Sequence, residues 1–247
     1  LVHEDDAALL HPLHGHAPGT PDPRYLAVKT AYERMRERDG GFAKIHFASA
    51  DTPEECVLLL AHAFCDVQMG IEVLVEPYAS WFRRQDLRPA YRYYVDLLRM
   101  LQVQRPGARW LLKSPAHLWA IDVLLEQTPD ACIVFTHRDP RESVASYCSM
   151  LESLLESRHF AALPDLGPRV LEYLGASLER GLEMRDRAEP GRFLDVAYGD
   201  FVADPLGEAR RIHAHFGLDF PAEVERAMRE HVDAHPQGEH GAHEYDL

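Results

Sequence analysis

The stretch from Cys132 to Ser146 constrains the fold more than any other part of the sequence. Its first four residues, Cys132 to Phe135, are apolar or β-prone, a run that suits a buried strand and is too short for a buried helix. Asp139-Pro140 follows, and proline disfavours helical geometry before it but suits the first turn of a helix. Asp139 supplies an N-cap oxygen, and Glu142 completes a capping-box pattern. The stretch therefore predicts a strand, a tight turn and a helix.

Two polar residues give this junction its chemistry. Arg138 stands at the carboxyl end of the strand, where open α/β sheets bind ligands, and Ser146 lies two turns into the helix. The free N–H groups of the helix start, the guanidinium and the hydroxyl predict an anion site, most naturally for phosphate. The alternative is that Arg138 pairs with a carboxylate and Ser146 is an ordinary helix residue.

A second junction of the same kind surrounds Lys113. A short apolar strand from Trp110 is expected to end there, with Ser114 as cap and a helix from Pro115 to about Gln127. If the two strands are parallel, Lys113 and Arg138 share one edge of the sheet. Lysine is rare in this chain, with three against 23 arginines, which favours a compact point charge at this position. The alternative is a strand-end lysine that reaches solvent.

His117 follows Lys113 by four residues, one turn into the expected helix. Its imidazole could hydrogen-bond a substrate hydroxyl and act as base, because the ordinary pKa of histidine is near neutrality. A structural histidine is the alternative.

Hydrophobic periodicity and capping signals predict the remaining elements. A third apolar strand is expected at Phe193–Tyr198. Aromatic residues in the Pro77 segment and the Leu87 helix are spaced for a core, although an acceptor pocket stays open. Helices are expected at Pro23–Arg38, from Thr52-Pro53, at Leu87–Gln104, Pro140–His159, Val170–Ala188, Leu206–Phe216 and Pro221–Val232.

Charge and length narrow the class of protein. The 247 residues suit one α/β domain, and the net charge of −14 argues against binding to nucleic acid or to an anionic membrane surface. The segment from Arg99 to Arg141 is the exception, since its six basic and four acidic residues give +2, which leaves −16 for the rest of the chain. A locally basic segment in an acidic chain suits a small anionic ligand.

Cysteine and histidine usage points to no metal site. The four cysteines lack CxxC spacing, and free thiols in a reducing cytosol are expected. The histidine-rich ends of the chain read as loops. At the amino-terminal end no acidic or cysteine partner stands at ligand spacing, and at the carboxyl-terminal end there is no cysteine and no fixed helical i,i+4 pair of histidines. No run reaches the length of a membrane span, and no signal-peptide pattern opens the sequence. We therefore expect a cytoplasmic protein without a metal.

Four motifs in register resemble bacterial sulfotransferases that use 3′-phosphoadenosine-5′-phosphosulfate (PAPS). They are WLLKSPAHL at 110–118, PDACIVFTHRDPRESVAS at 129–146, FLDVAYGDFVADP at 193–205 and GEHGAHEY at 238–245. The resemblance covers roughly 51–245 and implies an α/β, P-loop-NTPase-like fold of three layers, a central parallel sheet flanked by many helices. It also implies a single sulfotransferase-like domain over 1–247.

The resemblance assigns roles to residues of this sequence. Arg138 and Ser146 would bind the 3′-phosphate of PAPS, and Tyr198 would contact the adenine side. Lys113 looks like the lysine placed near the transferring sulfuryl group. The loop that contains Gly238 and Gly241 looks like the segment that closes over the nucleotide.

One family element is missing between Leu1 and Leu247. The 5′-phosphosulfate loop, a turn similar to Pro-Arg-Ser-Gly-Thr-Thr, is not found, and residues 15–20 have no cation and no preceding strand to replace it. Its natural place is upstream of Leu1, together with the carboxylate base that several related enzymes carry after it. This chain is therefore expected to carry half of the cofactor site.

Three function classes follow. The first is an enzyme that moves a sulfuryl group from PAPS to a hydroxyl or amine of a small molecule, lipid or sugar, with Lys113 at the bridging oxygen, His117 as base and no metal. The second is a non-catalytic nucleotide-binding or interaction module derived from that fold. The third, a nucleotide or sugar kinase, is opposed by the lack of a Gly-x-x-x-x-Gly-Lys-Ser/Thr motif. Acceptor identity and assembly into a homo-oligomer are left open.

Overall fold

The computed structural model describes residues 2–3, 22–38, 47–65, 76–104, 107, 109–157 and 165–236. The chain divides into two compact units. Unit 1 comprises Leu1–Gln127 and Met150–Ala162, and unit 2 comprises Thr128–Ser149 and Leu163–Leu247. That 1–247 form one sulfotransferase-like domain stays a prediction. Among the described residues, no helix has both the length and the apolar character that a membrane crossing needs.

Unit 1 is built mainly from helices. Its elements are β1 (Val2–His3), α2 (Pro23–Arg38), β2 (Pro53–Glu54), α4 (Val57–Ala61), α6 (Glu76–Phe82), α7 (Arg88–Gln104), the 3-10 helix η1 (Pro115–Trp119) and α8 (Ile121–Gln127). The last turns of α9 (Pro140–Ser157) also belong to this unit. The bounds of α2 match the sequence prediction, and α7 begins one residue later than predicted.

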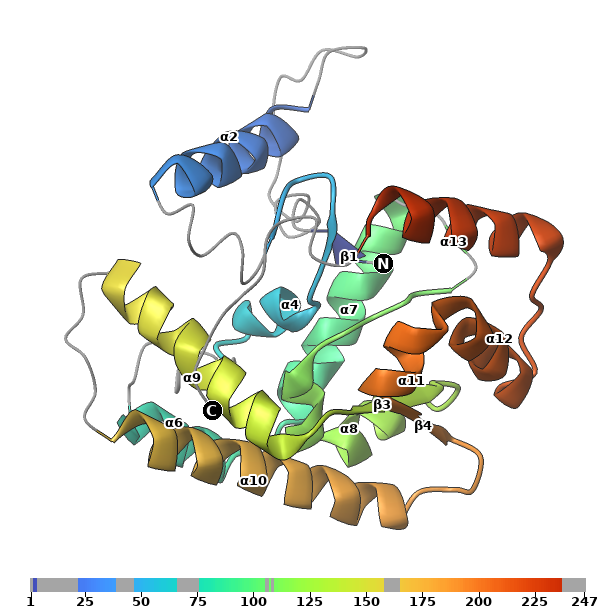
Figure 1. Cartoon of the computed structure of the whole chain (residues 1–247). Coiled ribbons are helices and arrows are strands. Elements are labelled where there is room, and N and C mark those ends of the chain that lie inside the picture. The colour runs from blue at the N-terminus through green and yellow to red at the C-terminus, as the bar shows by residue number, and fades with distance from the viewer. Residues whose placement is uncertain are drawn as a thin grey trace. The chain divides into compact units, whose positions relative to one another are not determined.

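Helix α7 supplies the centre of the unit 1 core. Tyr91, Tyr94 and Leu101 are spaced to lie on one face of the helix, and their exposed fractions are only 2%, 0% and 0%. α4 and α8 pack on α7 (Figure 1) and bury Leu59, Ile121 and other apolar side chains. Each large side chain buried in this way stabilises the fold by about 1.5–3 kcal/mol. Tyr91 and Tyr94 are therefore core residues, as periodicity favours.

Unit 2 contains a pair of parallel strands with helices around it. The elements are β3 (Ile133–His137), the first part of α9, α10 (Leu166–Asp186), β4 (Phe193–Ala197), α11 (Tyr198–Ala203), α12 (Pro205–His215) and α13 (Ala222–Ala234). β3 and β4 lie side by side in the register Ile133↔Phe193 to His137↔Ala197, and α11 and α12 contact β4 (Figure 1). The strands predicted at Cys132–Phe135 and Phe193–Tyr198 are present, and their parallel pairing fits the expected parallel sheet.

The packing of β3 differs from the expected fully buried strand. Phe135 is buried, whereas Val134 is 38% exposed and Thr136 is exposed. This alternation is typical of a strand with one face on the core and the other exposed.

Three predictions in unit 1 are wrong. No helix begins at Thr52, because its hydroxyl oxygen accepts a hydrogen bond from the N–H of Ser49 at 2.9 Å, and α4 begins only at Val57. Trp110–Lys113 is not a strand. The helix expected over Pro115–Gln127 is divided into η1 and α8, because Ala120 leaves helical geometry with φ −153° and ψ 39°.

Asp195 ties β4 to its neighbours in unit 2. Its carboxylate is 2.6 Å from His137 Nε2 on β3 and also accepts a hydrogen bond from Arg185 on α10. Desolvation raises the pKa of Asp195, but the hydrogen bonds from His137 and Arg185 outweigh it, so the pKa lies below its usual value. The folded state therefore favours the ionised form.

We expect Asp195→Asn to lower Tm at pH 7, because it removes the carboxylate that His137 and Arg185 share. A depressed carboxyl pKa contributes stability that is present above the unfolded value and lost as pH falls through the folded one. The difference in Tm between wild type and variant should therefore narrow below about pH 4. Thermal unfolding followed by circular dichroism from pH 3 to 7 measures it. The same change at Asp233, exposed on α13, should leave Tm unchanged, and a pH-independent loss in Asp195→Asn would contradict the assignment.

Candidate functional site

The start of α9 is built as the sequence predicts. Asp139 caps the helix, since its Oδ1 accepts from the N–H of Arg141 at 2.9 Å and its carbonyl accepts from the N–H of Ser143 at 2.9 Å. The hydrogen bond from the Arg141 side chain, and after it the one from the Arg141 backbone N–H, lower the pKa of Asp139 to about 2. Pro140 has no N–H, and Asp139 accepts the N–H groups of Arg141 and Ser143. Few N–H groups at the start of α9 are therefore left to bind an anion. The expected anion site therefore depends mainly on side chains.

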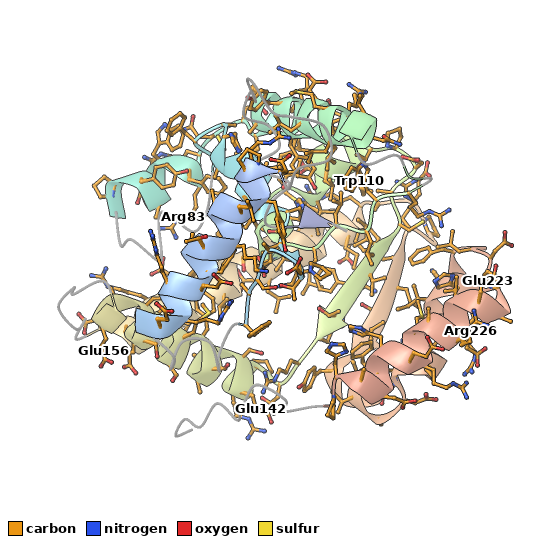
Figure 2. The ribbon with its side chains drawn as sticks, turned by 90° about the horizontal axis from the view of Figure 1, so that it is seen from above. Arg83, Trp110, Glu142, Glu156, Glu223 and Arg226 are labelled. Carbon is orange, nitrogen blue, oxygen red and sulfur yellow. The ribbon has the colours of Figure 1, made fainter. Side chains whose placement is uncertain are left out.

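Arg138 follows β3 directly, and its guanidinium is held from two sides. Its Nε donates to Glu142 Oε2 at 3.0 Å, so Glu142 pairs with Arg138 and does not complete the predicted capping box. Figure 2 shows Glu142 where β3 leads into α9. The guanidinium carbon also lies 4.9 Å from the ring centre of Tyr198, within cation–π distance.

Tyr198 is the first residue of α11 and directly follows β4. Because β3 and β4 are parallel, Arg138 and Tyr198 leave the same edge of this strand pair. Ser146 is half-buried on α9 and lies four residues, about one turn, beyond Glu142 on the same face. Unit 2 therefore gathers Arg138 and Tyr198 in contact, with Ser146 on the helix that Arg138 precedes.

Lys113 lies in unit 1, in an irregular segment before η1. The cap of η1 is confirmed, because Ser114 Oγ accepts from the N–H of Ala116 at 3.1 Å and Pro115 occupies the first position. The Lys113 ammonium forms an ion pair with Glu55. The Lys113 carbonyl accepts from the N–H of Cys56 at 2.9 Å.

The half-buried His117 belongs to a polar cluster with the buried Cys56 and Tyr91. Tyr91 OH is 2.8 Å from His117 Nδ1, and Cys56 Sγ is 3.3 Å from His117 Nε2 and 3.4 Å from the Lys113 carbonyl oxygen. One arrangement of protons satisfies all three contacts: Tyr91 O–H donates to Nδ1, Nε2–H donates to the sulfur, and the thiol donates to the carbonyl. Cys56, Tyr91 and His117 therefore form a chain of hydrogen bonds that ends on Lys113.

Burial sets the protonation of this cluster. Desolvation lowers the pKa of His117 to about 4, so the ring is neutral at pH 7. Desolvation likewise raises the pKa of the Cys56 thiol and of the Tyr91 hydroxyl, which both stay protonated. The Tyr94 hydroxyl is buried beside Cys56, and its pKa is raised by desolvation and then by that neighbour.

The role of His117 as base stays a prediction. An acceptor hydroxyl would have to replace Tyr91 or Cys56 as a partner of the ring. Glu55, Cys56 and Tyr91 are the residues that sequence reasoning missed here, because no motif or spacing links positions 55 and 56 to 91 and 113. Their one signal was apolar or helical periodicity, which indicates burial but not contact.

The remaining predicted site residues have these outcomes. Gly238 and Gly241 lie outside the described residues. Because residues 110–113 form no strand, the predicted sheet edge shared by Lys113 and Arg138 loses its basis. The two residues belong to different units, and that they lie close together stays a prediction. Within the described ranges, no cluster of three or more histidine, cysteine or acidic residues could hold a metal ion.

Comparison with known proteins decides the family. The sequence model of the sulfotransferase family matches residues 8–222. The chain belongs to the sulfotransferase family. The prediction of a sulfotransferase from the four motifs is thereby confirmed.

Similar proteins come from mycobacteria. Omega-hydroxy-beta-dihydromenaquinone-9 sulfotransferase Stf3, from Mycobacterium tuberculosis and Mycobacterium bovis, is 33% identical over 131 residues, which are 51% of this chain and 33% of that protein. Sulfotransferase STF1 from M. tuberculosis superimposes with a TM-score of 0.80 and 31% identity over 93% of this chain and 63% of its own. STF9 from Mycobacterium avium gives 0.77 and 27% over 87% and 56%.

These structures confirm the expected α/β, P-loop-like fold. The region that matches Stf3 covers only 33% of the Stf3 sequence. This chain covers less than two thirds of STF1 and of STF9.

A neutral, half-buried His117 predicts a pH-dependent loss of stability. The folded pKa of about 4 lies below the unfolded value near 6.5, so the unfolded state binds the proton first. The contribution of neutral His117 to the free energy of unfolding is complete above pH 6.5 and falls by roughly 3 kcal/mol as the pH drops towards 4. Urea unfolding at several pH values should show this slope in wild type and a flatter one in His117→Gln. Exposed His215→Gln should keep the wild-type slope, and an unchanged slope in His117→Gln would refute the assignment.

Proposed function

We propose that this protein binds PAPS, with its 3′-phosphate on Arg138, and transfers the sulfuryl group to a hydroxyl of a small-molecule acceptor. The observation that carries the proposal is the placement of the Arg138 guanidinium after β3, at the start of α9 and against the Tyr198 ring. A guanidinium offers a phosphate two parallel hydrogen bonds, and the tyrosine ring offers an adenine a flat apolar surface. Membership of the sulfotransferase family supports the reaction type.

The donor set of unit 2 fits a phosphate. The side chain of Arg138 is 37% exposed, which leaves its charge accessible. The Ser146 hydroxyl, on the α9 face that also carries Glu142, can donate to a phosphate oxygen. We assign Arg138 and Ser146 to the 3′-phosphate and Tyr198 to the adenine side. Gly238 and Gly241 are proposed for the loop that covers the nucleotide.

Bound PAPS supplies an activated sulfuryl group, and the protein positions and neutralises the reacting groups. The Lys113 ammonium is proposed to stabilise the charge that develops on the bridging oxygen as its bond to sulfur breaks and adenosine 3′,5′-bisphosphate leaves. Its side chain is 72% exposed, so the ammonium is available to a ligand while it pairs with Glu55. His117 is proposed as the base only if an acceptor displaces one of its two partners. No step requires a metal.

The acceptor class is proposed more broadly than the donor. The name of the Stf3 relatives contains an omega-hydroxy compound, which supports a hydroxyl as the group that receives the sulfuryl. Small metabolites, lipids and sugars all carry such a group. Transfer of ³⁵S-labelled sulfate from PAPS to extracted hydroxylated small molecules tests the reaction directly. Nucleotide binding without transfer to any acceptor would favour the non-catalytic module.

Replacing Arg138 with Ala should remove the preference for a 3′-phosphate. We expect wild type to bind adenosine 3′,5′-bisphosphate more tightly than adenosine 5′-monophosphate, by roughly 1.5–3 kcal/mol for a charge-assisted contact. In Arg138→Ala the two nucleotides should bind alike. Isothermal titration calorimetry with both ligands gives the difference.

Arg141→Ala is the matched control. Arg141 lies three residues away, is 86% exposed and pairs with Asp139. Its removal should leave the preference for the bisphosphate intact. Equal affinities of the two nucleotides for wild type would show that the 3′-phosphate contributes nothing to binding. An unchanged preference in Arg138→Ala would show that the 3′-phosphate binds elsewhere.

Glu142→Gln should strengthen binding of the bisphosphate. Glu142 occupies Arg138 Nε and brings a negative charge close to the expected phosphate. An exposed i,i+4 ion pair contributes only about 0.3–0.5 kcal/mol, so its loss costs little stability. We expect affinity to rise a few-fold by calorimetry, and more at low salt than at high salt. Weaker binding would mean that Glu142 orients Arg138 for the ligand rather than competing with it.

A further inference from the structure

The ion pair between Glu55 and Lys113 joins segments 58 positions apart in the sequence. Its two members differ in exposure, since the Glu55 side chain is 16% exposed and that of Lys113 is 72% exposed. The carboxylate is therefore held within the fold of unit 1 while most of the lysine side chain faces outward. Such a carboxylate acts as a fixed anchor for a long, mobile side chain.

The backbone beside this pair is fixed as well. Cys56, the residue after Glu55, donates its N–H to the carbonyl of Lys113 at 2.9 Å. Its thiol lies 3.4 Å from the same carbonyl oxygen and 3.3 Å from His117 Nε2. Cys56 is fully buried. The two main chains are thus hydrogen-bonded to each other one residue away from the ion pair, over a buried cluster.

This arrangement lowers the conformational entropy that is lost when the ion pair forms. A lysine side chain carries about 2 kcal/mol of rotamer entropy, which an exposed pair must overcome. Here the backbone bond fixes one end of each side chain, and the low exposure of Glu55 shows that its carboxylate is already ordered. Only Lys113 has to be restrained, so the pair favours one direction for the ammonium.

We propose that Glu55 is a positioning residue for sulfuryl transfer, which holds the Lys113 ammonium in the orientation that the reaction uses. The inference rests on the proposed function, because the role of Lys113 belongs to it. Glu55 acts through Lys113 and needs no contact with the acceptor or the nucleotide. Catalysis by a charged group depends on its being in place before the charge develops, so loss of the anchor lowers kcat more than it changes ligand binding.

A double-mutant cycle on kcat tests this role. We expect Glu55→Gln to lower kcat for transfer of ³⁵S-labelled sulfate roughly tenfold, since small misplacements of a catalytic group cost up to about 10²-fold. The affinity for adenosine 3′,5′-bisphosphate should stay within about twofold of wild type. In a Lys113→Met background the same change should have no further effect on kcat, because Glu55 acts only through Lys113. Additive effects in the cycle, or a kcat of Glu55→Gln equal to wild type, would overturn the proposal.

Glu126→Gln is the matched control. Glu126 also belongs to unit 1 and pairs with Arg88 across two elements, with Nε and Oε2 2.9 Å apart. Its replacement should leave kcat unchanged. Thermal unfolding of both glutamine variants separates loss of positioning from loss of fold.

A second measurement does not depend on activity. Reductive ¹³C-methylation keeps the charge of lysine and should give one signal for each of the three lysines, assigned by replacing each with Arg. The Lys113 signal should shift in Glu55→Gln, whereas the Lys29 signal should stay. A wild-type protein that transfers no label overturns the proposed function, and the positioning role with it. Transfer of label together with an unchanged Lys113 signal overturns only the role of Glu55.

Discussion

The carbonyl oxygen of Lys113 is the point on which the described part of unit 1 depends. It accepts the N–H of Cys56 at 2.9 Å and lies 3.4 Å from the thiol of the same residue. The thiol in turn contacts His117, and His117 contacts Tyr91 of α7. Buried polar groups cost free energy unless each finds a partner, and in this cluster each partner comes from a different part of the chain. The contacts therefore specify how α7, η1 and the segment before α4 pack together.

This cluster also explains why an irregular segment can carry a functional lysine. Trp110–Lys113 has no strand partners, so regular secondary structure does not hold it. At Lys113, the last residue of this segment, the two contacts from Cys56 to the carbonyl oxygen hold the chain in place instead. A site on an irregular segment is precise only when a supporting shell fixes it, and here the shell is buried, neutral at pH 7 and hydrogen-bonded.

Local signals in the sequence predicted the fold well where neighbours in sequence decide the structure. The bounds of α2, the passage from β3 through Arg138 to α9 and the cap by Asp139 all depend on residues within a few positions of one another. Errors arose where a side chain found a partner that a local rule had assigned differently. Thr52 bonded Ser49 instead of capping a helix, and Glu142 paired with Arg138 instead of completing a capping box. Glu55 was invisible to any local rule, because its partner lies 58 positions away.

The two cations of the proposed site each have a carboxylate partner, and the physics of the two pairs differs. Arg138 and Glu142 are 37% and 45% exposed, one turn apart, so their pairing is worth only about 0.3–0.5 kcal/mol. A phosphate with charge-assisted hydrogen bonds gains about 1.5–3 kcal/mol and can displace Glu142. The Glu55 side chain is mostly covered, so breaking its ion pair with Lys113 would leave a carboxylate with little access to water. The first pair is therefore exchangeable with a ligand, whereas the second persists and orients its cation. An anion-binding site needs the first property, and a group that stabilises a transition state needs the second.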